Sequence, residues 1–381
     1  MKVIFLTHNY PRFPGDLPGA FLHPLALGLT RLGHEVRVVA PSDAGKGGED
    51  LVDGIPVRRV RYGTPARERY AYSGTMQSAA RSPRGLLALG RLIRNLRRAA
   101  RDEAVGHPDA VIHAHWWIPA GLAAPPERPL VLTVHGTDGA LLRTSAVARR
   151  LATPVFRRSR VITTVSSALT RTVTSITGLG PERCQVQPMP VDTTGWGWSV
   201  GGGGCLVVAR LTRQKRVHLA LGALAAMKQA GREVACTIVG DGPERAALEA
   251  LAREAGLASS VRFTGRLPFG DILGLLLTAD IALLPFEQEG FGLSAAEALM
   301  AGVPVVACED GGGLLDIVPR SGPGRVAAPD PAALAVAAAE LLDDPASREE
   351  ARQSGASWRR QLAPDSVAAR FAGWYREAAG A

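Results

Sequence analysis

The sequence predicts an α/β protein made of two doubly wound, Rossmann-like domains, and three observations support this fold class. The chain has 381 residues, whereas a single hydrophobic core rarely serves more than about 250–300. Short apolar, β-branched runs alternate with longer stretches of helical period, which is typical of βαβ units and parallel sheets. A run of four glycines, residues 201–204, divides the chain near its middle.

Ten apolar runs read as strands, five on each side of the glycine run. In the first half they cover residues 3–6, 36–39, 111–115, 131–134 and 161–165. In the second half they cover residues 205–209, 236–239, 261–263, 281–284 and 303–307. Each half can therefore build its own parallel sheet. We expect the carboxyl ends of both sets of strands to face one cleft, because doubly wound sheets bind ligands at that end.

The glycine run marks the predicted domain boundary. Four consecutive glycines fit neither a strand nor a helix without a large entropic cost, so they indicate a hinge or linker. The first domain is expected over residues 1–190, the linker over 191–204 and the second domain over 205–358. Residues 359–381 should form a terminal helix, which either packs back on the first domain through its aromatic side chains or is an ordinary amphipathic helix.

Composition excludes several classes of protein. Hydrophobic residues make up 46% of the chain and charged residues 21%, so it is neither a disordered tail nor a fibre. The four cysteines stand far apart without a C-x-x-C pair, which favours neither a zinc site nor a disulfide framework and fits a reduced cytosol. No window offers the roughly 18 apolar residues of a membrane-spanning helix, and the first apolar run is shorter than a signal-peptide core of about 7–15 residues. We expect a cytoplasmic protein.

The net charge of +9 has two readings. Of the 44 Lys and Arg only four are lysine, which indicates a compositional bias toward arginine rather than a code for binding. One segment is more specific, because its arginines form a basic stripe at helical spacing beside a leucine-rich side. These are Arg91, Arg94, Arg97, Arg98 and Arg101. Such a helix either lies on anionic lipid at the inner face of a membrane or is a solvated face of an arginine-rich protein.

The most informative stretch is residues 285–306, which follows a predicted strand and turns through glycines into a helix. The N–H groups of residues 292–294 at the start of this helix are free to bind a phosphate. Glu289 precedes the helix and Glu297 lies in its first turns. Because carboxylates beside a phosphate would repel it unless they accept hydrogen bonds from sugar hydroxyls, the stretch indicates a nucleotide sugar. Alternatively, Glu289 is a solvated loop acid and Glu297 is favoured there by the helix dipole.

Two cations suit a diphosphate. Arg210 and Lys215 follow the predicted strand 205–209, and two positive charges complement a leaving group of about two negative charges, each charge-assisted bond contributing about 1.5–3 kcal/mol. They would also stabilise the charge that develops on the departing phosphate. Ordinary surface charge is the alternative reading.

Together these motifs resemble the retaining GT-B glycosyltransferases of family 4, also called group 1. Glu289 and Glu297 form E-x7-E within E-G-F-G-L-x3-E-A-x3-G-x-P-V-V, and Arg210 and Lys215 match the family's R-L-x3-K. The motifs G-D-G-P, V-R-F-T-G and G-G-L-L-D-I-V follow in the family's order, with Asp316 in place of the usual Glu. The resemblance covers nearly the whole chain and implies the GT-B fold, in which two Rossmann-like domains face a cleft.

Two segments of the first half also match the family. Residues 9–21 join the first strand to the first helix, and the family places such a loop over the donor phosphates and acceptor, although the usual Gly-Gly pair is absent because Ala20 follows Gly19. Residues 135–138, H-G-T-D, resemble the family's H-G-x-D, whose His lies near the donor sugar. A structural histidine is the alternative.

His113 and His115 share one face of a predicted strand. Two histidines could begin a metal site, but no third ligand is near them in sequence. The family often carries an H-x-H strand here, which leaves an acceptor-facing role open for His115 and Trp116.

The resemblance implies a set of site residues. Those expected to act in catalysis are Arg210, Lys215, Glu289 and His135. Those expected to bind the donor are Gly19, Gly240, Arg262, Gly290, Phe291, Gly292, Leu293, Ser294 and Glu297. Those expected to face the acceptor are Asp16, His115 and Asp138, within loops around residues 9–20, 62–85 and 113–145.

The predicted function is therefore retaining transfer of a hexosyl group from a nucleoside diphosphate sugar to a hydroxyl of a glycolipid, cell-surface polysaccharide or natural product. The family favours front-face attack, so we assign no protein general base, and closure of the two domains would complete the site. No D-x-D motif occurs, so neither a cofactor nor a metal is expected. The alternatives are another GT-B enzyme, such as a nucleotide-sugar epimerase, and a basic membrane-binding protein with an inactive transferase fold. No motif indicates nucleic acid as a partner.

Overall fold

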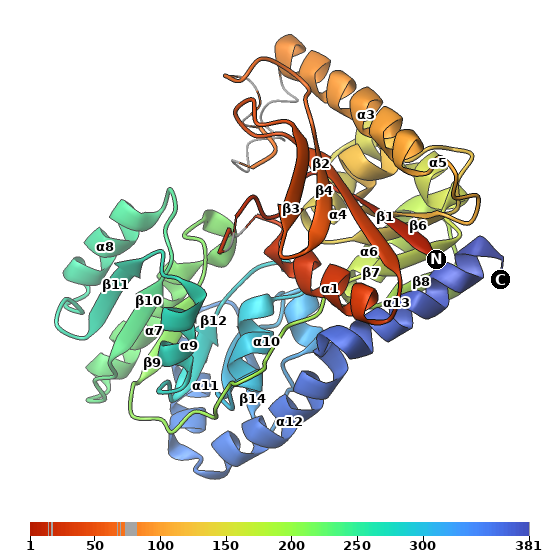
Figure 1. Cartoon of the computed structure of the whole chain (residues 1–381). Coiled ribbons are helices and arrows are strands. Elements are labelled where there is room, and N and C mark those ends of the chain that lie inside the picture. Colours follow the sequence, from red (N-terminus) through yellow and green to blue (C-terminus); the bar gives the residue numbers. More distant parts are fainter. Residues whose placement is uncertain (14, 17, 67, 69, 73–81, 381) are drawn as a thin grey trace. The chain divides into compact units, whose positions relative to one another are not determined.

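The chain folds into two compact units, each built on a parallel sheet. The computed structural model describes residues 1–381 except 14, 17, 67, 69, 73–81 and 381. Unit 1 comprises Met1–Asp192 and Leu362–Ala381, and unit 2 comprises Thr193–Gln361 (Figure 1). Helices alternate with parallel strands in both units, so the predicted α/β class with two Rossmann-like domains is confirmed.

The sheet of unit 1 has eight strands in the order β3-β4-β2-β1-β5-β6-β7-β8, all parallel except β3, which pairs antiparallel with β4. The strands are β1 (Lys2–Leu6), β2 (Glu35–Pro41), β3 (Gly48–Val52), β4 (Ile55–Val60), β5 (Val111–His115), β6 (Leu130–Val134), β7 (Val161–Thr164) and β8 (Cys184–Val186). Every residue of β5, β6 and β7 is buried, as expected for the central strands of a parallel sheet.

Three strands of unit 1 were not predicted from the sequence. β3 and β4 form a hairpin around Asp53 and Gly54, whose φ angles of 45° and 83° fit a tight two-residue turn. β3 is polar and mostly exposed, β4 contains Pro56, and two of the three residues of β8 are exposed. They therefore lack the continuous apolar run by which the buried strands were recognised.

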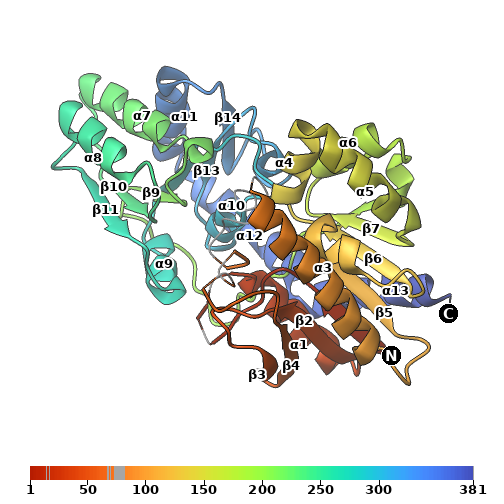
Figure 2. The same ribbon diagram turned by 90° about the horizontal axis from the view of Figure 1, so that it is seen from above.

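The helices of unit 1 cover both faces of its sheet. They are η1 (Ala20–Leu22), α1 (His23–Arg31), α3 (Pro83–Glu103), η2 (Trp117–Gly121), α4 (Thr137–Thr144), α5 (Ala146–Arg158), α6 (Ser167–Thr177), η3 (Pro181–Arg183) and α13 (Pro364–Ala379). α3, α5 and α6 lie on one face, and α1 and α13 on the other (Figure 2). This division follows from right-handed crossovers, because α1 and α3 connect strands in opposite directions along the sheet.

The terminal helix α13 packs against α1 within unit 1. Gly28 of α1 permits this approach, since a Cβ there would lie 2.8 Å from the carbonyl oxygen of Pro364. Phe371 and Tyr375 are fully buried, and the Tyr375 hydroxyl lies 2.7 Å from Nδ1 of His113 on β5. The predicted second domain ended at residue 358, whereas in the structure the chain returns to unit 1 at Leu362.

The sheet of unit 2 has six parallel strands in the order β11-β10-β9-β12-β13-β14. The strands are β9 (Cys205–Val208), β10 (Cys236–Val239), β11 (Val261–Gly265), β12 (Ile281–Leu284), β13 (Val305–Cys308) and β14 (Gly324–Ala327). The helices are η4 (Arg213–Lys215), α7 (Val217–Gln229), α8 (Arg245–Glu254), α9 (Phe269–Leu276), α10 (Leu293–Met300), η5 (Gly313–Asp316), α11 (Pro331–Asp343) and α12 (Ala346–Leu362). α7 packs against α8 and α11 on one face of this sheet, while α10 lies against β12 and β13.

The four glycines, residues 201–204, do not form the predicted linker between the two units. They lie inside unit 2, and the units divide earlier, between Asp192 and Thr193. The N–H groups of Gly202 and Gly204 each donate to the Asp280 carboxylate at 2.8 Å. Both glycines have positive φ angles, 90° and 75°, so the run forms an ordered turn that leads into β9.

Candidate functional site

The loop before α10 is fixed by backbone contacts to the loop after β13. Glu289 N donates to the carbonyl oxygen of Gly311 at 3.0 Å, and Gly313 N donates to that of Glu289 at 2.7 Å. Gly312 lies so close that a Cβ would be 2.8 Å from the Glu289 carbonyl oxygen. The G-G-L-L-D-I-V motif therefore supports the backbone position of Glu289.

The N-terminus of α10 presents a row of unpaired N–H groups. Gly292 precedes the helix with a φ angle of 91°, and a Cβ there would lie 2.9 Å from Leu314. Among the described residues, no acceptor is found for the N–H groups of residues 291–294. The dipole of the helix adds partial positive charge at the same place, so the turn suits an anion.

Lys215 and Glu289 form an ion pair beside this turn. Lys215 Nζ also lies 4.0 Å from the ring centroid of Phe286, which is a favourable cation–π position. Gln214 fixes η4 to the same loop, since its Nε2 donates to the Glu287 carbonyl oxygen at 2.9 Å and its own carbonyl accepts from Glu287 N at 3.0 Å. The structure thus brings together residues that the sequence places far apart.

Arg216 forms ion pairs with the loop before α10 and with the loop after β13, and the sequence analysis did not identify it as a site residue. Its guanidinium pairs with Glu287 at 3.0 Å and with Asp310 at 2.8 Å. Its φ angle of 44° is unusual for a residue other than glycine. The signal available in the sequence was its position directly after the R-L-x3-K motif.

Arg210 lies just after β9, and its position is set by the backbone. Leu211 N donates to the Asp241 carbonyl oxygen at 3.0 Å, and a Cβ on Gly240 would lie only 1.8 Å from the Ala209 carbonyl oxygen. Only glycine fits there, which gives the G-D-G-P motif a structural reason. The Arg210 side chain is exposed and pairs with no other group in the described part of the chain, so it can bind a ligand.

Glu297 and Arg262 stand in contrasting surroundings. Burial on α10 raises the pKa of the Glu297 carboxyl to about 7, and no hydrogen bond or ion pair to it is found among the described residues. Arg262 is exposed on the edge strand β11, where Nη2 lies 3.5 Å from Thr237 Oγ1. It precedes the carboxyl end of β11 by three residues and does not join the cluster around Lys215.

In unit 1, imidazole and indole rings gather at the carboxyl ends of β1, β5 and β6. His115 Nδ1 lies 3.1 Å from His135 Nε2, and the ring centroids of Trp116 and His135 are 4.3 Å apart. Phe21 of η1 contacts His135 with a centroid separation of 5.2 Å. Burial lowers the pKa values of both His115 and His135 well below the ordinary value, so both rings are neutral.

His8 completes this ring cluster and was missed as a site residue. It lies two residues after the end of β1, its ring centroid lies 4.1 Å from that of Trp116, and burial lowers its pKa to about 4. Its position shortly after a buried strand, as His135 lies after β6, was the signal that could have found it.

Asp138 was predicted to face the acceptor, but both its carboxylate oxygens contact backbone. Oδ1 accepts hydrogen bonds from the N–H groups of His135, Gly136 and Gly139, each at 3.1 Å. Oδ2 accepts from Trp117 N at 3.3 Å. Burial raises the pKa of the Asp138 carboxyl to about 6, although the hydrogen bonds from these backbone donors lower it. The structure therefore places Asp138 as a support of the turn that carries His135.

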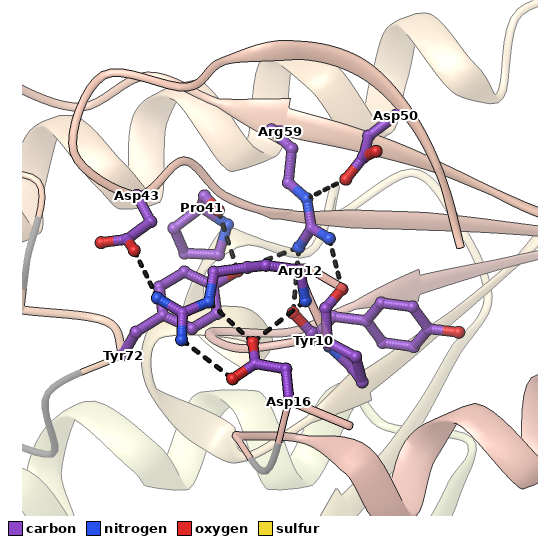
Figure 3. A network of polar contacts seen from close by, with 9 residues as sticks. Tyr10, Arg12, Asp16, Pro41, Asp43, Asp50, Arg59 and Tyr72 are labelled. Atoms are coloured by element: carbon purple, nitrogen blue, oxygen red, sulfur yellow. Dashed lines mark hydrogen bonds and ion pairs between the residues drawn. The ribbon is translucent and has the colours of Figure 1, made fainter. Parts of the chain in front are cut away.

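Asp16 is likewise occupied, in the network of Figure 3. Arg12 donates to its two oxygens at 2.7 and 2.9 Å, forms an ion pair with Asp43, and lies 4.6 Å from the ring centroid of Tyr72. This arginine holds the pKa of the Asp16 carboxyl below its usual range despite burial. Arg59 extends the network, donating to the Tyr72 hydroxyl at 3.0 Å.

The predicted acceptor loops are only partly described. Residues 14 and 17 of the first loop, and 67, 69 and 73–81 of the second, lie outside the described residues. Gly19 has a φ angle of 76°, and a Cβ there would lie 2.6 Å from the Asn9 carbonyl oxygen, which explains the glycine by packing.

The basic stripe on α3 divides into two groups. Arg97 donates to the carbonyl oxygens of Leu122 and Ala123 at 2.5 and 3.3 Å, and Arg101 pairs with Glu127 at 2.6 Å. The other three, Arg91, Arg94 and Arg98, are exposed and pair with no acid in the described part of the chain.

Comparison with protein families gives two matches in sequence order. Residues 19–194 match the family described as Glycosyltransferase Family 4, and residues 203–358 match the family described as Glycosyl transferases group 1.

Two enzymes are similar in sequence over most of the chain. A glycogen synthase of Mycobacterium tuberculosis is 29% identical over 379 residues, covering 92% of this chain and 88% of that protein. A 2-deoxystreptamine glucosyltransferase of Streptomyces kanamyceticus is 32% identical over 254 residues, covering 60% and 65%.

Solved structures share the fold of the whole chain. A sucrose-phosphate synthase from Thermosynechococcus elongatus has a TM-score of 0.77 at 17% identity, covering 99% of this chain and 98% of that one. Anabaena HepE in complex with UDP and glucose has a TM-score of 0.73 at 20% identity, covering 98% and 99%.

Proposed function

Because the chain belongs to the group 1, family 4 glycosyltransferases and has their GT-B fold, we propose that it transfers a hexosyl group from a nucleoside diphosphate sugar with retention of anomeric configuration. The observation that carries this proposal is in unit 2, where Lys215 pairs with Glu289 beside the unpaired N–H groups of residues 291–294. Cations, amides and a carboxylate in one cluster can bind both the phosphate and the sugar of such a donor.

The diphosphate would bind to Arg210, Lys215 and the start of α10. Two cations and a row of N–H groups neutralise about two negative charges, and they stabilise the additional charge on the leaving oxygen as the glycosidic bond breaks. No metal is required by this charge balance. Metal independence remains a prediction, and transferase activity that survives exhaustive chelation with EDTA would support it.

The carboxylates would bind the hydroxyls of the donor. Glu289 accepts hydrogen bonds from the transferred sugar, and Glu297, which has no partner among the described residues, accepts them from the ribose. In unit 1 the neutral His135 binds the donor sugar. We assign no protein general base, because front-face attack passes the acceptor proton to the leaving phosphate.

Glucose is the first donor sugar to test. The similar Streptomyces enzyme is named a glucosyltransferase, and the similar Anabaena structure holds UDP and glucose. A panel of UDP-, ADP- and GDP-glucose, followed by the mannose donors, should contain one compound that raises the melting temperature and is slowly hydrolysed. The anomer of the released or transferred sugar, read by proton NMR, tests retention. Inversion would refute the retaining mechanism, and no hydrolysis of any donor would favour an inactive binding protein.

We propose further that unit 1 contacts anionic lipid on the cytoplasmic face of a membrane. Unit 1 carries 28 Lys and Arg against 16 Asp and Glu, a net charge of +12, whereas unit 2 carries 16 against 19, a net charge of −3. The whole surplus of positive charge therefore belongs to unit 1. Among the described helices, none is long and apolar enough to span a bilayer.

Helices α3 and α5 lie on the same face of the sheet (Figure 2). Both carry exposed basic and apolar side chains. Leu86 and Leu87 on α3 and Val147 on α5 are 55%, 55% and 69% exposed. The same two helices also carry exposed arginines: Arg84, Arg91, Arg94, Arg98, Arg150 and Arg157. Apolar side chains among cations suit the interface of an anionic bilayer.

Cosedimentation with vesicles tests this contact. The protein should bind phosphatidylglycerol vesicles and not phosphatidylcholine vesicles, with binding weakened by salt. The double change Arg91→Gln and Arg94→Gln should reduce binding severalfold, whereas Arg253→Gln with Arg320→Gln in unit 2 should not. Equal binding of both double variants, or none to either vesicle, would refute the contact.

A further inference from the structure

The adjacent histidines of β5 and β6 occupy different environments. His115 ends β5 and is fully buried, while His135 follows β6 and is partly exposed. His115 lies opposite Thr133 in the parallel register, and Trp116 N donates to the Thr133 carbonyl oxygen at 2.9 Å. This pairing places the two histidines side by side at the carboxyl edge of the sheet.

The polar partners of His115 are few. Its Nδ1 lies 3.1 Å from His135 Nε2, and its Nε2 is buried with no hydrogen-bond partner among the described residues. The neighbouring His113 does not compete, because its Nδ1 contacts the Tyr375 hydroxyl and its Nε2 the Thr133 hydroxyl, each at 2.7 Å. His135 is therefore the single polar partner found for His115 in the described structure.

Two neutral imidazoles can share only one proton in this contact, which leaves two arrangements. If His135 donated through Nε2–H, the proton of His115 would sit on its own Nε2, as a buried N–H without an acceptor. If His115 donates through Nδ1–H, its Nε2 keeps a bare lone pair instead. Orphaned buried N–H groups are rarer in proteins than under-satisfied acceptors, so the second arrangement is favoured.

We infer that His115 is a positioning residue, whose Nδ1–H fixes His135 as the tautomer protonated at Nδ1, so that His135 meets the substrate as a hydrogen-bond donor. Trp116 and Phe21 pack against the His135 ring and limit its rotation. No partner for His135 Nδ1 is found among the described residues, so this N–H remains available.

The consequence concerns the reaction, and it rests on the proposed function. His135 has its Nε2 lone pair engaged by His115 and its Nδ1 protonated, so neither nitrogen can accept a proton from the acceptor hydroxyl. Its Nδ1–H can donate to a sugar hydroxyl or a phosphate oxygen. This tautomer thus explains how a histidine lies in the site without acting as a general base.

The tautomer can be measured directly in the whole protein without any ligand. Protein labelled with ¹⁵N-histidine should give, for His135, an Nδ1 shift typical of a protonated nitrogen and an Nε2 shift typical of an unprotonated one. The His135→Gln variant assigns the signals. A His135 protonated at Nε2 overturns the inference, whether or not the enzyme proves to be a glycosyltransferase.

Two substitutions of His115 test its role through His135. His115→Phe keeps a ring but removes the donor, so the His135 signals should change to the mixture of tautomers seen for free histidine, and kcat should fall about 10-fold or more. His115→Asn places an N–H near the original Nδ1 and should restore the tautomer and much of kcat. The affinity for the nucleoside diphosphate alone should stay within about twofold in both. An unchanged His135 tautomer in a folded His115→Phe variant would contradict the positioning role. If that variant does not fold, the wild-type spectrum still shows whether His135 is protonated at Nδ1 or at Nε2.

Discussion

The ammonium of Lys215 forms an ion pair with the carboxylate of Glu289, although 74 positions separate the two residues in the sequence. The side chains are only 18% and 20% exposed, so water screens the pair incompletely. The residue predicted to bind the diphosphate and the residue predicted to bind the sugar are therefore direct neighbours. A diphosphate that binds Lys215 must share it with Glu289.

Glu289→Gln should separate sugar transfer from nucleotide binding. Loss of the carboxylate removes a charged hydrogen-bond acceptor for the sugar, so we expect kcat to fall about 10- to 100-fold. Lys215 loses its competing anion, so the nucleoside diphosphate should bind a few times more tightly in calorimetry. Glu309→Gln, at an exposed position after β13, is the matched control. Weaker nucleotide binding with normal turnover would contradict the shared-lysine arrangement.

Arg210→Ala tests the second cation. The side chain is exposed and pairs with no described residue, so its removal should leave the free energy of unfolding unchanged, while kcat falls about 100-fold or more through loss of charge stabilisation in the transition state. Arg253→Ala, also exposed and in unit 2, should alter neither quantity. Near-normal turnover of the Arg210 variant would remove this residue from the mechanism.

The sequence identified elements whose residues are buried on both faces. Every residue of β5 and β6 is buried. Strands buried on both faces are rich in apolar residues, so these two were recognisable in the sequence. β3 escaped because a polar edge strand is defined by its hairpin partner rather than by an apolar run. The conformation of the glycine run could not be predicted for a similar reason. It depends on hydrogen bonds to the Asp280 carboxylate, which lies far along the chain.

Motifs located the candidate site but could not reveal competing partners. Lys215 and Glu289 were recognised separately, whereas their ion pair required the fold. Asp16 and Asp138 have the residue type expected for binding hydroxyls, yet Arg12 occupies one and backbone N–H groups occupy the other. The role of a carboxylate that a motif singles out is thus ambiguous until its hydrogen-bond donors are known.

Gly240→Ala should destabilise unit 2 severely. The added Cβ would lie 1.8 Å from the Ala209 carbonyl oxygen, and the φ angle of 128° is strained for any other residue. Backbone on both sides would have to move, so we expect a loss of about 3 kcal/mol or more in denaturant unfolding. Gly274→Ala is the matched control, because a Cβ there meets nothing within 4 Å. Alanine favours a helix over glycine, so this change in α9 should raise the free energy of unfolding by up to about 1 kcal/mol. Comparable stability of the two variants would refute the close-contact explanation.

Glu297 should make the stability of unit 2 decrease as pH rises. Burial raises its pKa from 4.5 to about 7. Below pH 4.5 both folded and unfolded states hold the proton, and between 4.5 and 7 only the folded state does, so the free energy of unfolding falls through this window. Glu297→Gln cannot ionise, so its stability relative to wild type should increase by about 2–3 kcal/mol between pH 4.5 and pH 8. Urea unfolding at several pH values measures this difference, with the exposed Glu254→Gln as control. If the free energy of unfolding changed with pH equally in wild type and Glu297→Gln, the carboxylate would be solvated or paired at neutral pH. It would then not be an unpaired acceptor available to a ribose hydroxyl.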